Sequence, residues 1–196
     1  METKEKLLPW HITKSELLLD RSPWMRIFSD DVQLPDGSMV EGYLRLESRG
    51  YVMVVPVDDS KRIGLVRSYK KGVDAIDIQP PAGVLEPGED VLTSAKRELR
   101  EEMGCEATSW HSLGTYTISG NYGAGKVHFY LASGAHQVVE PDSGDLEEQV
   151  VVWLPIEKVH EMWISGQMKQ LGSMAALGLA FSRIASNHTM PELGEG

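Results

Sequence analysis

The stretch Gly83-Val84-Leu85-Glu86-Pro87-Gly88-Glu89 is followed, after seven residues, by Arg97-Glu98-Leu99-Arg100-Glu101-Glu102-Met103-Gly104-Cys105, and these two segments decide the fold. At about 100° per residue, a helix over 90–103 places Glu98, Glu101 and Glu102 on one face, because residues three and four apart are neighbours on a helix. The other side carries an apolar core stripe, made by Leu92, Ala95, Leu99 and Met103. The pattern therefore predicts an amphipathic helix with a concentrated acidic face.

This acidic face predicts a cation site. Like charges so close together destabilise a helix by about 0.2–0.5 kcal/mol per pair, and a bound divalent cation compensates for that repulsion. Hard cations such as Mg²⁺ take oxygen ligands, prefer one or two carboxylates, and complete their shell with substrate phosphates and water. The alternative interpretation is a solvated acidic helix face that binds no metal.

The loop before this helix supports the cation site. Turn residues bracket it, with Pro80-Pro81-Ala82-Gly83 on one side and Pro87-Gly88 on the other, and so rigid a loop brings backbone carbonyls toward a cation. Arg97 is placed to pair with Glu89 across the loop and to hold the loop against the helix. That ion pair is expected whether or not a metal binds. Gly104 fits the left-handed position that ends a helix.

Together these residues resemble the Nudix box, which is a glycine, five residues, a glutamate, seven residues, then Arg-Glu-aliphatic-x-Glu-Glu-x-Gly and a final apolar residue. The matching positions are Gly83, Glu89, Arg97, Glu98, Leu99, Glu101, Glu102 and Gly104, with Cys105 as the final apolar residue. Because each common residue type occurs at about one position in fifteen, such a match rarely arises by chance. The resemblance implies an α/β fold, the Nudix α/β/α sandwich with a mixed β-sheet preceded by an N-terminal β-hairpin. It also implies a metal-dependent hydrolase that cleaves the pyrophosphate of a nucleoside diphosphate linked to another moiety.

Over residues 22–180 the chain resembles one branch of the family, the ADP-ribose and nucleoside-diphosphate-sugar pyrophosphatases. Five segments carry this likeness: Leu34-Pro35-Asp36-Gly37, Val66-Arg67-Ser68-Tyr69-Lys70, Pro81-Ala82-Gly83, Val127-His128-Phe129-Tyr130-Leu131-Ala132 and Val152-Trp153-Leu154-Pro155. In that branch an N-terminal sheet helps to build a homodimer, so a homodimer is expected. The chain departs from the branch at Ser68-Tyr69-Lys70, where Gln-Tyr-Arg is common, at Gln79, where Glu is common, and at Ser119-Gly120, where ADP-ribose enzymes typically have proline.

Three functions are compatible with this resemblance. The first is hydrolysis of an ADP-ribose or ADP-sugar type of substrate. The second keeps the enzyme class but changes the substrate to GDP-mannose, a dinucleoside polyphosphate or a damaged nucleotide. The third is a non-catalytic domain that binds a nucleotide sugar, and it predicts loss of the box acids or a fused DNA-binding helix pair, neither of which the sequence contains.

The resemblance assigns roles to individual residues. The predicted ligands of Mg²⁺, with Mn²⁺ as a substitute, are Glu98, Glu101, Glu102 and the Ala82 carbonyl. A carboxylate should take the proton from the attacking water. This base is Glu101 of the box or Glu147 of the acidic loop 142–148, with Glu148 as the one-residue alternative, and Arg97 completes the catalytic set. The loop has an alternative role as a solubilising acidic segment.

Contacts with substrate are predicted at Arg67, Lys70, Asn121, Tyr122 and Lys126. The last three lie in 120–126, which has the glycine-x₄-glycine-lysine frame of a P-loop. Val127 follows instead of Ser or Thr, and the next residues alternate like a strand, whereas a P-loop opens a helix. We therefore expect either a mobile loop over the active site or a plain hairpin loop.

Composition restricts the class of protein. A chain of 196 residues is long enough for one substantial core. Its net charge of −10, from 19 basic and 29 acidic residues, argues against nonspecific binding to nucleic acid. A single cysteine excludes an intramolecular disulfide and suits a reducing compartment. The N-terminus lacks a signal-peptide core, and no apolar run reaches the roughly 20 residues of a membrane span. A cytoplasmic protein is expected.

Three regions are expected along the chain: an extension with a β-hairpin over 1–47, a Nudix domain over 48–186 and a loose tail over 187–196. Within the extension, residues 1–20 should form a short helix or stay loose, and a hairpin should form around Leu34–Gly37. Strands are expected at Tyr51–Val57, Ile63–Tyr69, Trp110–Thr117, Val127–Ala132 and Val150–Leu154. Helices are expected at 90–103, 155–164 and 168–186.

Overall fold

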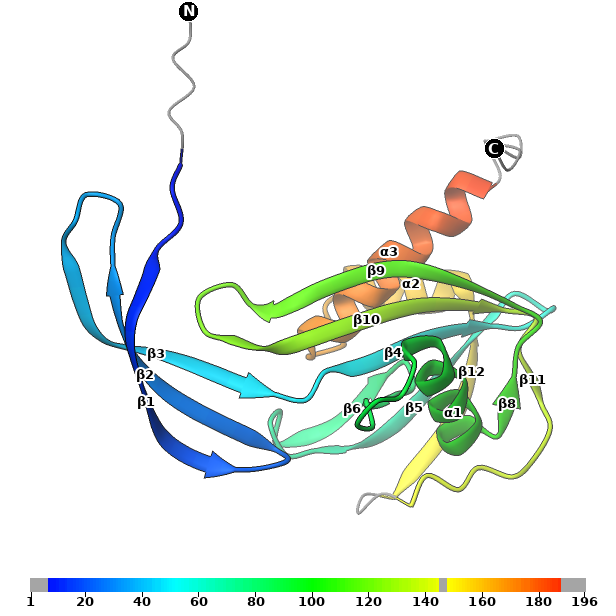
Figure 1. Cartoon of the computed structure of the whole chain (residues 1–196). Coiled ribbons are helices and arrows are strands. Elements are labelled where there is room, and N and C mark those ends of the chain that lie inside the picture. The colour runs from blue at the N-terminus through cyan, green and yellow to red at the C-terminus, as the bar shows by residue number, and fades with distance from the viewer. Residues whose placement is uncertain (1–6, 145–147, 188–196) are drawn as a thin grey trace, which may run out of the picture. The chain divides into compact units, whose positions relative to one another are not determined.

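The computed structural model describes residues 7–144 and 148–187 and contains two compact units (Figure 1). The first, called the N-terminal unit here, consists of Met1–Arg49 and Thr117–Lys126, and the second, called the main unit, consists of Gly50–Tyr116 and Val127–Gly196. The predicted boundaries at residues 47 and 186 stay a prediction.

An antiparallel three-stranded sheet forms most of the N-terminal unit. Its strands are β1 (His11–Arg21), β2 (Met25–Gln33) and β3 (Met39–Ser48), each paired with the next. In the turn between β2 and β3, Gly37 has a φ of 86°, in the left-handed region that glycine favours. The expected hairpin is confirmed.

Strand β1 shows that the expectation for residues 1–20 was wrong, because a strand replaces the short helix or loose segment from His11 onward. Backbone pairing with β2 continues from His11, opposite Gln33, to Arg21, opposite Met25. The whole strand is exposed, so no buried face imposes an alternating apolar pattern on its sequence. Partnership with β2 decides its conformation. Residues 1–6 lie outside the described part of the chain.

One acid of this small sheet is buried and belongs to a network of ion pairs. Asp30 is 1% exposed; it accepts hydrogen bonds from Arg45 Nε at 2.7 Å and from Ser15 Oγ at 2.5 Å. Arg45 also pairs with Glu47, and Glu47 pairs with Arg26 at 2.5 Å. Two acids and two arginines thus neutralise one another across β2 and β3.

A mixed sheet forms the centre of the main unit. Its strands are β4 (Tyr51–Val57), β5 (Arg62–Lys70), β6 (Ala75–Gln79), β7 (Ala82–Val84), β12 (Gln149–Pro155) and the hairpin of β9 (Ser109–Ser119) and β10 (Gly123–Ser133), which belongs to both units. Residues 127–133 of β10 pair in parallel with β4, whereas β12 pairs antiparallel with β5. Short strands β8 (Cys105–Glu106) and β11 (His136–Gln137) form a separate pair.

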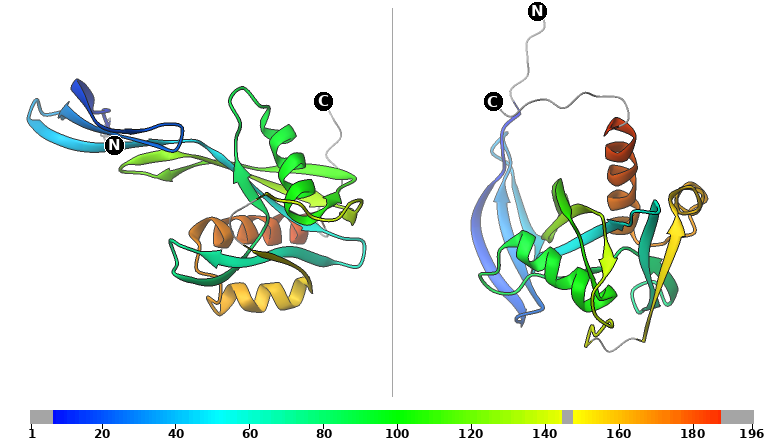
Figure 2. Two further views of the ribbon diagram at one scale, coloured as in Figure 1. Left: turned by 90° about the horizontal axis from the view of Figure 1, so that it is seen from below. Right: turned by 90° about the vertical axis from the view of Figure 1, so that its right-hand side faces the viewer.

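Helices cover both faces of this sheet (Figure 2). Strand β4 shows the reason, because its side chains alternate between two apolar clusters. Val52 and Val54 pack with Leu99 of α1 (Val91–Met103). Met53 and Val55 pack in the cluster that contains residues of α2 (Ile156–Ile164) and α3 (Leu171–Asn187). The expected α/β sandwich with a mixed sheet is confirmed.

Both ends of α1 have capping residues. The Asp90 side chain accepts a hydrogen bond from the Thr93 N–H at 3.0 Å, as an N-cap does. Gly104 ends the helix with a φ of 65°, and a Cβ there would lie 2.1 Å from the Val139 carbonyl oxygen. The predicted left-handed position of Gly104 is confirmed, so α1 begins and ends at defined residues.

The other predicted strands and helices of the main unit are confirmed with small changes at their ends. Strands β6, β7, β8 and β11 were not predicted, because two to five residues are too few for a periodic signal. Among the helices of the described residues, none combines the length and the apolar character that crossing a membrane would require.

Candidate active site

Strand β7 brings the loop of the motif against α1. It pairs antiparallel with β4, with Gly83 opposite the fully buried Val52. A Cβ at Gly83 would lie 1.9 Å from Cδ of Glu98 and 2.0 Å from each of its carboxylate oxygens. Only glycine therefore leaves room for the Glu98 carboxylate against the backbone of β7. The spacing of Gly83 and Glu98 in the sequence has this steric origin.

The three acids of the helix face differ in burial. Glu98 and Glu102 are 7% and 4% exposed, whereas the Glu101 side chain is 41% exposed. Glu102 accepts hydrogen bonds from the Ala82 N–H at 2.7 Å and from Gln149 Nε2 at 3.5 Å. Two carboxylates are thus held inside the protein while the third faces solvent, an arrangement that costs free energy unless opposite charge compensates for it.

Arg97 supplies part of that compensation. Its Nε and Nη2 donate to the two carboxylate oxygens of Glu89 at 2.9 and 3.0 Å, a bidentate contact that confirms the predicted ion pair across the loop. Its Nη1 donates to Glu98 at 2.6 Å and to Glu101 at 2.9 Å. The same guanidinium therefore fixes the loop and brings two helix carboxylates together.

These contacts shift protonation equilibria. Hydrogen bonds from the Arg97 guanidinium lower the pKa of Glu89 from 4.5 to about 2, against the opposing effect of burial. The same contact with Glu89 raises the pKa of Arg97 above its ordinary value. The pair is fully ionised at neutral pH.

The donor set fits a divalent cation. Glu98 and Glu101 converge on one positively charged nitrogen, Nη1 of Arg97, which marks a position where two carboxylates accept a cation. Side chains rich in carboxylate oxygen suit Mg²⁺ and Mn²⁺. Across residues 7–144 and 148–187, no three His, Cys, Asp or Glu side chains stand close enough together to hold a metal directly. The reason is local, since Nη1 lies between two of the acids and Glu102 faces the Ala82 N–H.

The candidate bases are only partly described. Glu101 is the most exposed of the three helix acids, so it is accessible to a water molecule. Glu147 lies outside the described residues. Glu148 is exposed and directly precedes β12. The choice between Glu101, Glu147 and Glu148 stays a prediction.

Gln149 is a site residue that sequence reasoning missed. It is the first residue of β12, and its side chain donates to Glu102, so this end of β12 lies at the acid cluster. Ser94 was missed as well, although its hydroxyl accepts a hydrogen bond from Arg97 Nη2 at 3.1 Å. The three-residue spacing from Ser94 to Arg97 was an available signal. No local pattern marks Gln149.

Two predicted substrate-binding residues, Arg67 and Lys70, lie on β5 in the main unit. Arg67 is exposed and is in register with Val150 of β12. Lys70 ends the strand, and its carbonyl accepts the Asp74 N–H of the following turn at 2.8 Å. Both cationic side chains are thus placed by the strand next to β12, and their role in substrate binding stays a prediction.

The other three, Asn121, Tyr122 and Lys126, belong to the N-terminal unit. The Tyr122 ring stacks with Tyr43 at 6.5 Å, and the Tyr43 hydroxyl donates to the Asn121 carbonyl at 3.2 Å. Lys126 is exposed on β10. Since a strand and not a helix follows this turn, the segment is a hairpin and the P-loop interpretation is excluded.

Comparisons with known proteins agree with this geometry. The family model described as NUDIX domain matches residues 47–171. The chain is 30% identical over 165 residues to an ADP-ribose pyrophosphatase of Mycobacterium tuberculosis, which covers 83% of this chain and 78% of that protein. It is 28% identical to a CMP-5'-(N-acetyl-N-hydroxy-3-aminopropyl)phosphonate hydrolase of Streptomyces rubellomurinus, over 87% of this chain and 84% of that one. It is 31% identical to the ADP compounds hydrolase NudE of Escherichia coli, over 57% and 60%.

A solved structure shares the fold. The crystal structure of an ADP compounds hydrolase superposes with a TM-score of 0.81 at 24% identity, covering 95% of this chain and all of the other. At that identity the likeness concerns the fold alone.

Proposed function

Because the chain belongs to the NUDIX domain family, we propose that it hydrolyses the pyrophosphate bond of an ADP-ribose or ADP-sugar type of substrate with the help of Mg²⁺. The broader prediction of a Nudix hydrolase resembling ADP-ribose pyrophosphatases is confirmed. One observation supports the finer proposal: Glu98 and Glu101 both accept hydrogen bonds from Nη1 of Arg97, on the helix that also carries the buried Glu102. Mn²⁺ is the expected substitute metal.

Each residue of the cluster has a role in this proposal. Glu98 and Glu102 would hold the metal, because burial and contacts with β7 fix their positions, and Glu101 and the Ala82 carbonyl would complete the protein ligands. When bound, Mg²⁺ neutralises the pyrophosphate charge and makes water a better nucleophile. Arg97, anchored on Glu89, is a positioning residue that keeps Glu98 and Glu101 together. The products would be a nucleoside monophosphate and a phosphorylated second moiety.

The base is proposed to be Glu101 or Glu147. A Gln variant of the true base should slow chemistry by about 10²–10⁴-fold and change KM less, because metal holds the phosphates. Glu147→Gln, Glu148→Gln and Glu101→Gln are therefore compared by kcat and KM over a range of pH. A slow Glu148→Gln beside an unaltered Glu147→Gln would move the assignment by one residue, and normal rates in both would leave Glu101.

Substrate contacts are proposed for Arg67 and Lys70 of the main unit, and each of Asn121, Tyr122 and Lys126 of the N-terminal unit is proposed separately as a substrate contact. Cationic side chains suit phosphate, and an aromatic ring offers a stacking surface to any base. Single Ala variants should raise KM more than they lower kcat. A kcat loss at constant KM would instead place a residue in the chemical step.

A panel of nucleoside diphosphate derivatives tests the substrate directly. ADP-ribose, ADP-glucose, GDP-mannose, a diadenosine polyphosphate and a CDP-linked compound are incubated with Mg²⁺ or Mn²⁺, and phosphate is scored after coupling to a phosphatase. The highest kcat/KM is expected for an ADP derivative, since several relatives are named as ADP-ribose pyrophosphatases or an ADP compounds hydrolase. A cytidine compound is the second candidate, because the relative named for a CMP-linked substrate aligns over 87% of the chain. Absence of turnover with every compound would contradict the proposal.

We also propose a homodimer formed through the N-terminal unit. Large apolar side chains are exposed on and beside β1 and β2: Trp10, Ile12, Leu17, Leu18, Leu19, Trp24 and Met25. Exposed apolar surface of this kind marks an interaction site, and an edge strand such as β1 is open to further pairing. Light scattering should give twice the chain mass at micromolar concentration. A monomer mass would contradict this assembly.

The cytoplasm remains the proposed compartment, because the single cysteine is a buried free thiol.

A further inference from the structure

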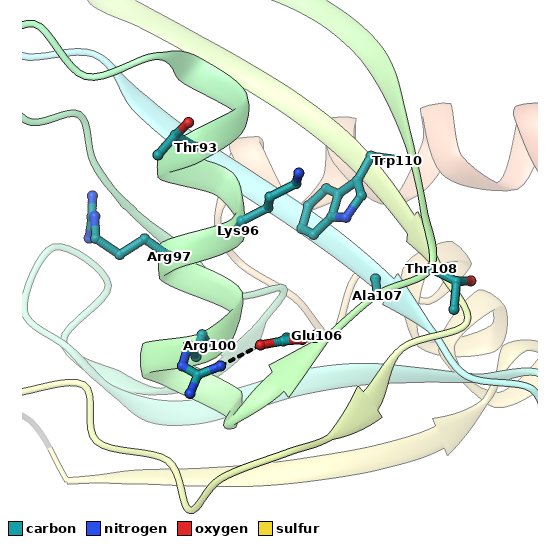
Figure 3. Close-up of a pocket in the computed structure, with 8 residues that line it drawn as sticks. All are labelled: Thr93, Lys96, Arg97, Arg100, Glu106, Ala107, Thr108 and Trp110. Atoms are coloured by element: carbon teal, nitrogen blue, oxygen red, sulfur yellow. Dashed lines mark hydrogen bonds and ion pairs between the residues drawn. The ribbon is translucent and has the colours of Figure 1, made fainter.

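A groove of about 530 Å³ lies along a side of α1 that carries none of the predicted metal ligands (Figure 3). Its helix wall is formed by residues three or four positions apart: Thr93, Lys96, Arg97 and Arg100. Its facing wall comes from the segment after the helix: Glu106, Ala107, Thr108 and Trp110. The volume is within the roughly 300–1,000 Å³ of small-molecule sites.

The groove is cationic on an acidic protein. The chain has a net charge of −10, yet three of the four charged groove residues are basic. Arg97 is engaged by the glutamates of the box. Within the described parts of the chain Lys96 forms no ion pair. An anion entering this groove would therefore meet an ammonium group that has no competing acid partner.

Arg100 is the second cation available to a ligand. It pairs with Glu106, and the two side chains are 49% and 56% exposed. Exposed ion pairs contribute little, so a phosphate dianion can replace the Glu106 carboxylate and accept two hydrogen bonds from the guanidinium. Lys96 and Arg100, one helical turn apart, both belong to the helix wall of the groove, Lys96 toward Trp110 and Arg100 toward Glu106 (Figure 3).

Trp110 provides the apolar surface of the groove. Its indole is half-buried and meets the Tyr130 ring edge-on at 6.3 Å, which fixes its orientation. Figure 3 shows Lys96 extending from α1 toward Trp110 on the facing wall. A groove with an aromatic ring near one end and cations along its helix wall matches a molecule that has an aromatic base at one end and a phosphate at the other.

We propose that this groove binds a nucleoside monophosphate, with the base stacked on Trp110 and the phosphate between Lys96 and Arg100. The inference does not rest on the proposed reaction, although that reaction would release such a molecule. Arg97 lines the groove and also contacts Glu98 and Glu101, so groove and acid cluster share one side chain.

Calorimetric titration of the metal-free full chain with AMP tests the proposal. Lys96→Gln and Trp110→Leu should each weaken AMP binding by about tenfold, and Glu106→Gln should tighten it about twofold because it releases Arg100. Lys158→Gln is the matched control, since Lys158 is an exposed lysine of α2 paired with Glu161; it should bind AMP normally. A melting curve of Trp110→Leu checks that this variant is folded. Lys96→Gln changes an exposed side chain, so its effect on AMP binding does not depend on core packing.

Glu102→Gln distinguishes AMP binding in the groove from AMP binding at the acid cluster, and this variant should leave the AMP affinity unchanged. Loss of AMP binding in Glu102→Gln with normal binding in Lys96→Gln would overturn the proposal, as would absence of AMP binding at millimolar concentration. Inorganic phosphate or adenosine binding as tightly as AMP would refute the two-part recognition. Lys96→Gln should keep full turnover of the best substrate. Absence of turnover in the wild type would contradict the proposed reaction, whereas normal AMP binding in Lys96→Gln would contradict the groove proposal.

Discussion

Two clusters of acids in this molecule, each with at least one buried carboxylate, contact arginine, and they differ in charge balance. In the N-terminal unit, Asp30 and Glu47 face Arg45 and Arg26, so two acids meet two cations. In the main unit Arg97 contacts three glutamates, which are Glu89, Glu98 and Glu101. A fourth glutamate, Glu102, is buried on the same helix as Arg97. Among the ion pairs of the described residues, the charges balance in the first network, whereas acids outnumber arginines in the second.

Charge balance distinguishes a structural ion pair from a candidate site. Burial alone does not do it, because Asp30 is more buried than Glu98 or Glu102. A network with equal numbers of acids and arginines already supplies the opposite charge that its acids require. An excess of buried acid is tolerated when a cation completes it, and metal ions are such cations. The proposed metal site would account for the excess of acid on α1, whereas the balanced cluster needs no ligand.

Removing one acid from the unbalanced cluster should have the largest effect. Glu102→Gln removes a proposed metal ligand and relieves repulsion, and its amide oxygen can still accept a hydrogen bond from the Ala82 N–H. We expect kcat to fall at least about a hundredfold, because metal charge stabilisation contributes several kcal/mol. The melting temperature of the metal-free variant should equal or slightly exceed that of the wild type. Normal turnover at saturating Mg²⁺ would contradict the site.

Breaking the balanced cluster should instead affect stability. Asp30→Asn leaves Arg45 partly buried beside a neutral group, and we expect a loss of about 2 kcal/mol in the stability of the N-terminal unit. Hydrogen exchange of the β2 and β3 amides measures it. Glu41→Gln replaces an exposed acid of β3 and should leave exchange unchanged. Equal exchange in both variants would refute a structural role for Asp30.

The loop anchor Glu89 should give a smaller, pH-dependent effect. Its folded-state pKa of about 2 is below the ordinary 4.5, so the stabilisation is present above pH 4.5 and disappears as pH falls toward 2. In Glu89→Gln the free energy of unfolding should therefore fall less steeply as the pH decreases through this window. At pH 6 it should be about 2 kcal/mol below that of the wild type. Denaturant titrations of the metal-free proteins measure this difference. Parallel curves for the two proteins would show that the contact adds nothing.

The smallest effect is expected at an exposed pair outside both clusters. Glu106→Gln removes the partner of Arg100, and both side chains are about half exposed. Such pairs contribute about 0–1 kcal/mol, and here we expect less than about 0.5. Denaturant unfolding at neutral pH checks it. A loss as large as that of Asp30→Asn would show that exposure does not separate the two kinds of pair.

The sequence predicted those parts whose signal is local and periodic. The acidic face of α1 follows from helical spacing, and the left-handed Gly104 follows from glycine stereochemistry. The pairing of Arg97 with Glu89 was predicted from the place of Glu89 in the loop before the helix. Strands β4 and β5 were predicted because burial on both faces produces continuous apolar runs.

The rest depends on partners that are distant in sequence. Strand β1 is exposed along its length and exists through pairing with β2, which composition does not encode. Gln149 and Glu102 are 47 positions apart in the sequence. They meet only because β12 pairs with β5. Burial of Glu98 beneath β7 likewise needs the pairing of β7 with β4.

The most direct test of the central claim is a titration of metal-free protein with Mn²⁺, followed by electron paramagnetic resonance. The wild type and Asp30→Asn should bind Mn²⁺ with the same affinity, whereas Glu98→Gln and Glu102→Gln should each weaken binding by at least about tenfold, since each removes a proposed carboxylate ligand. Unchanged Mn²⁺ affinity in both glutamine variants would contradict the assignment of the excess acid on α1 to a metal site.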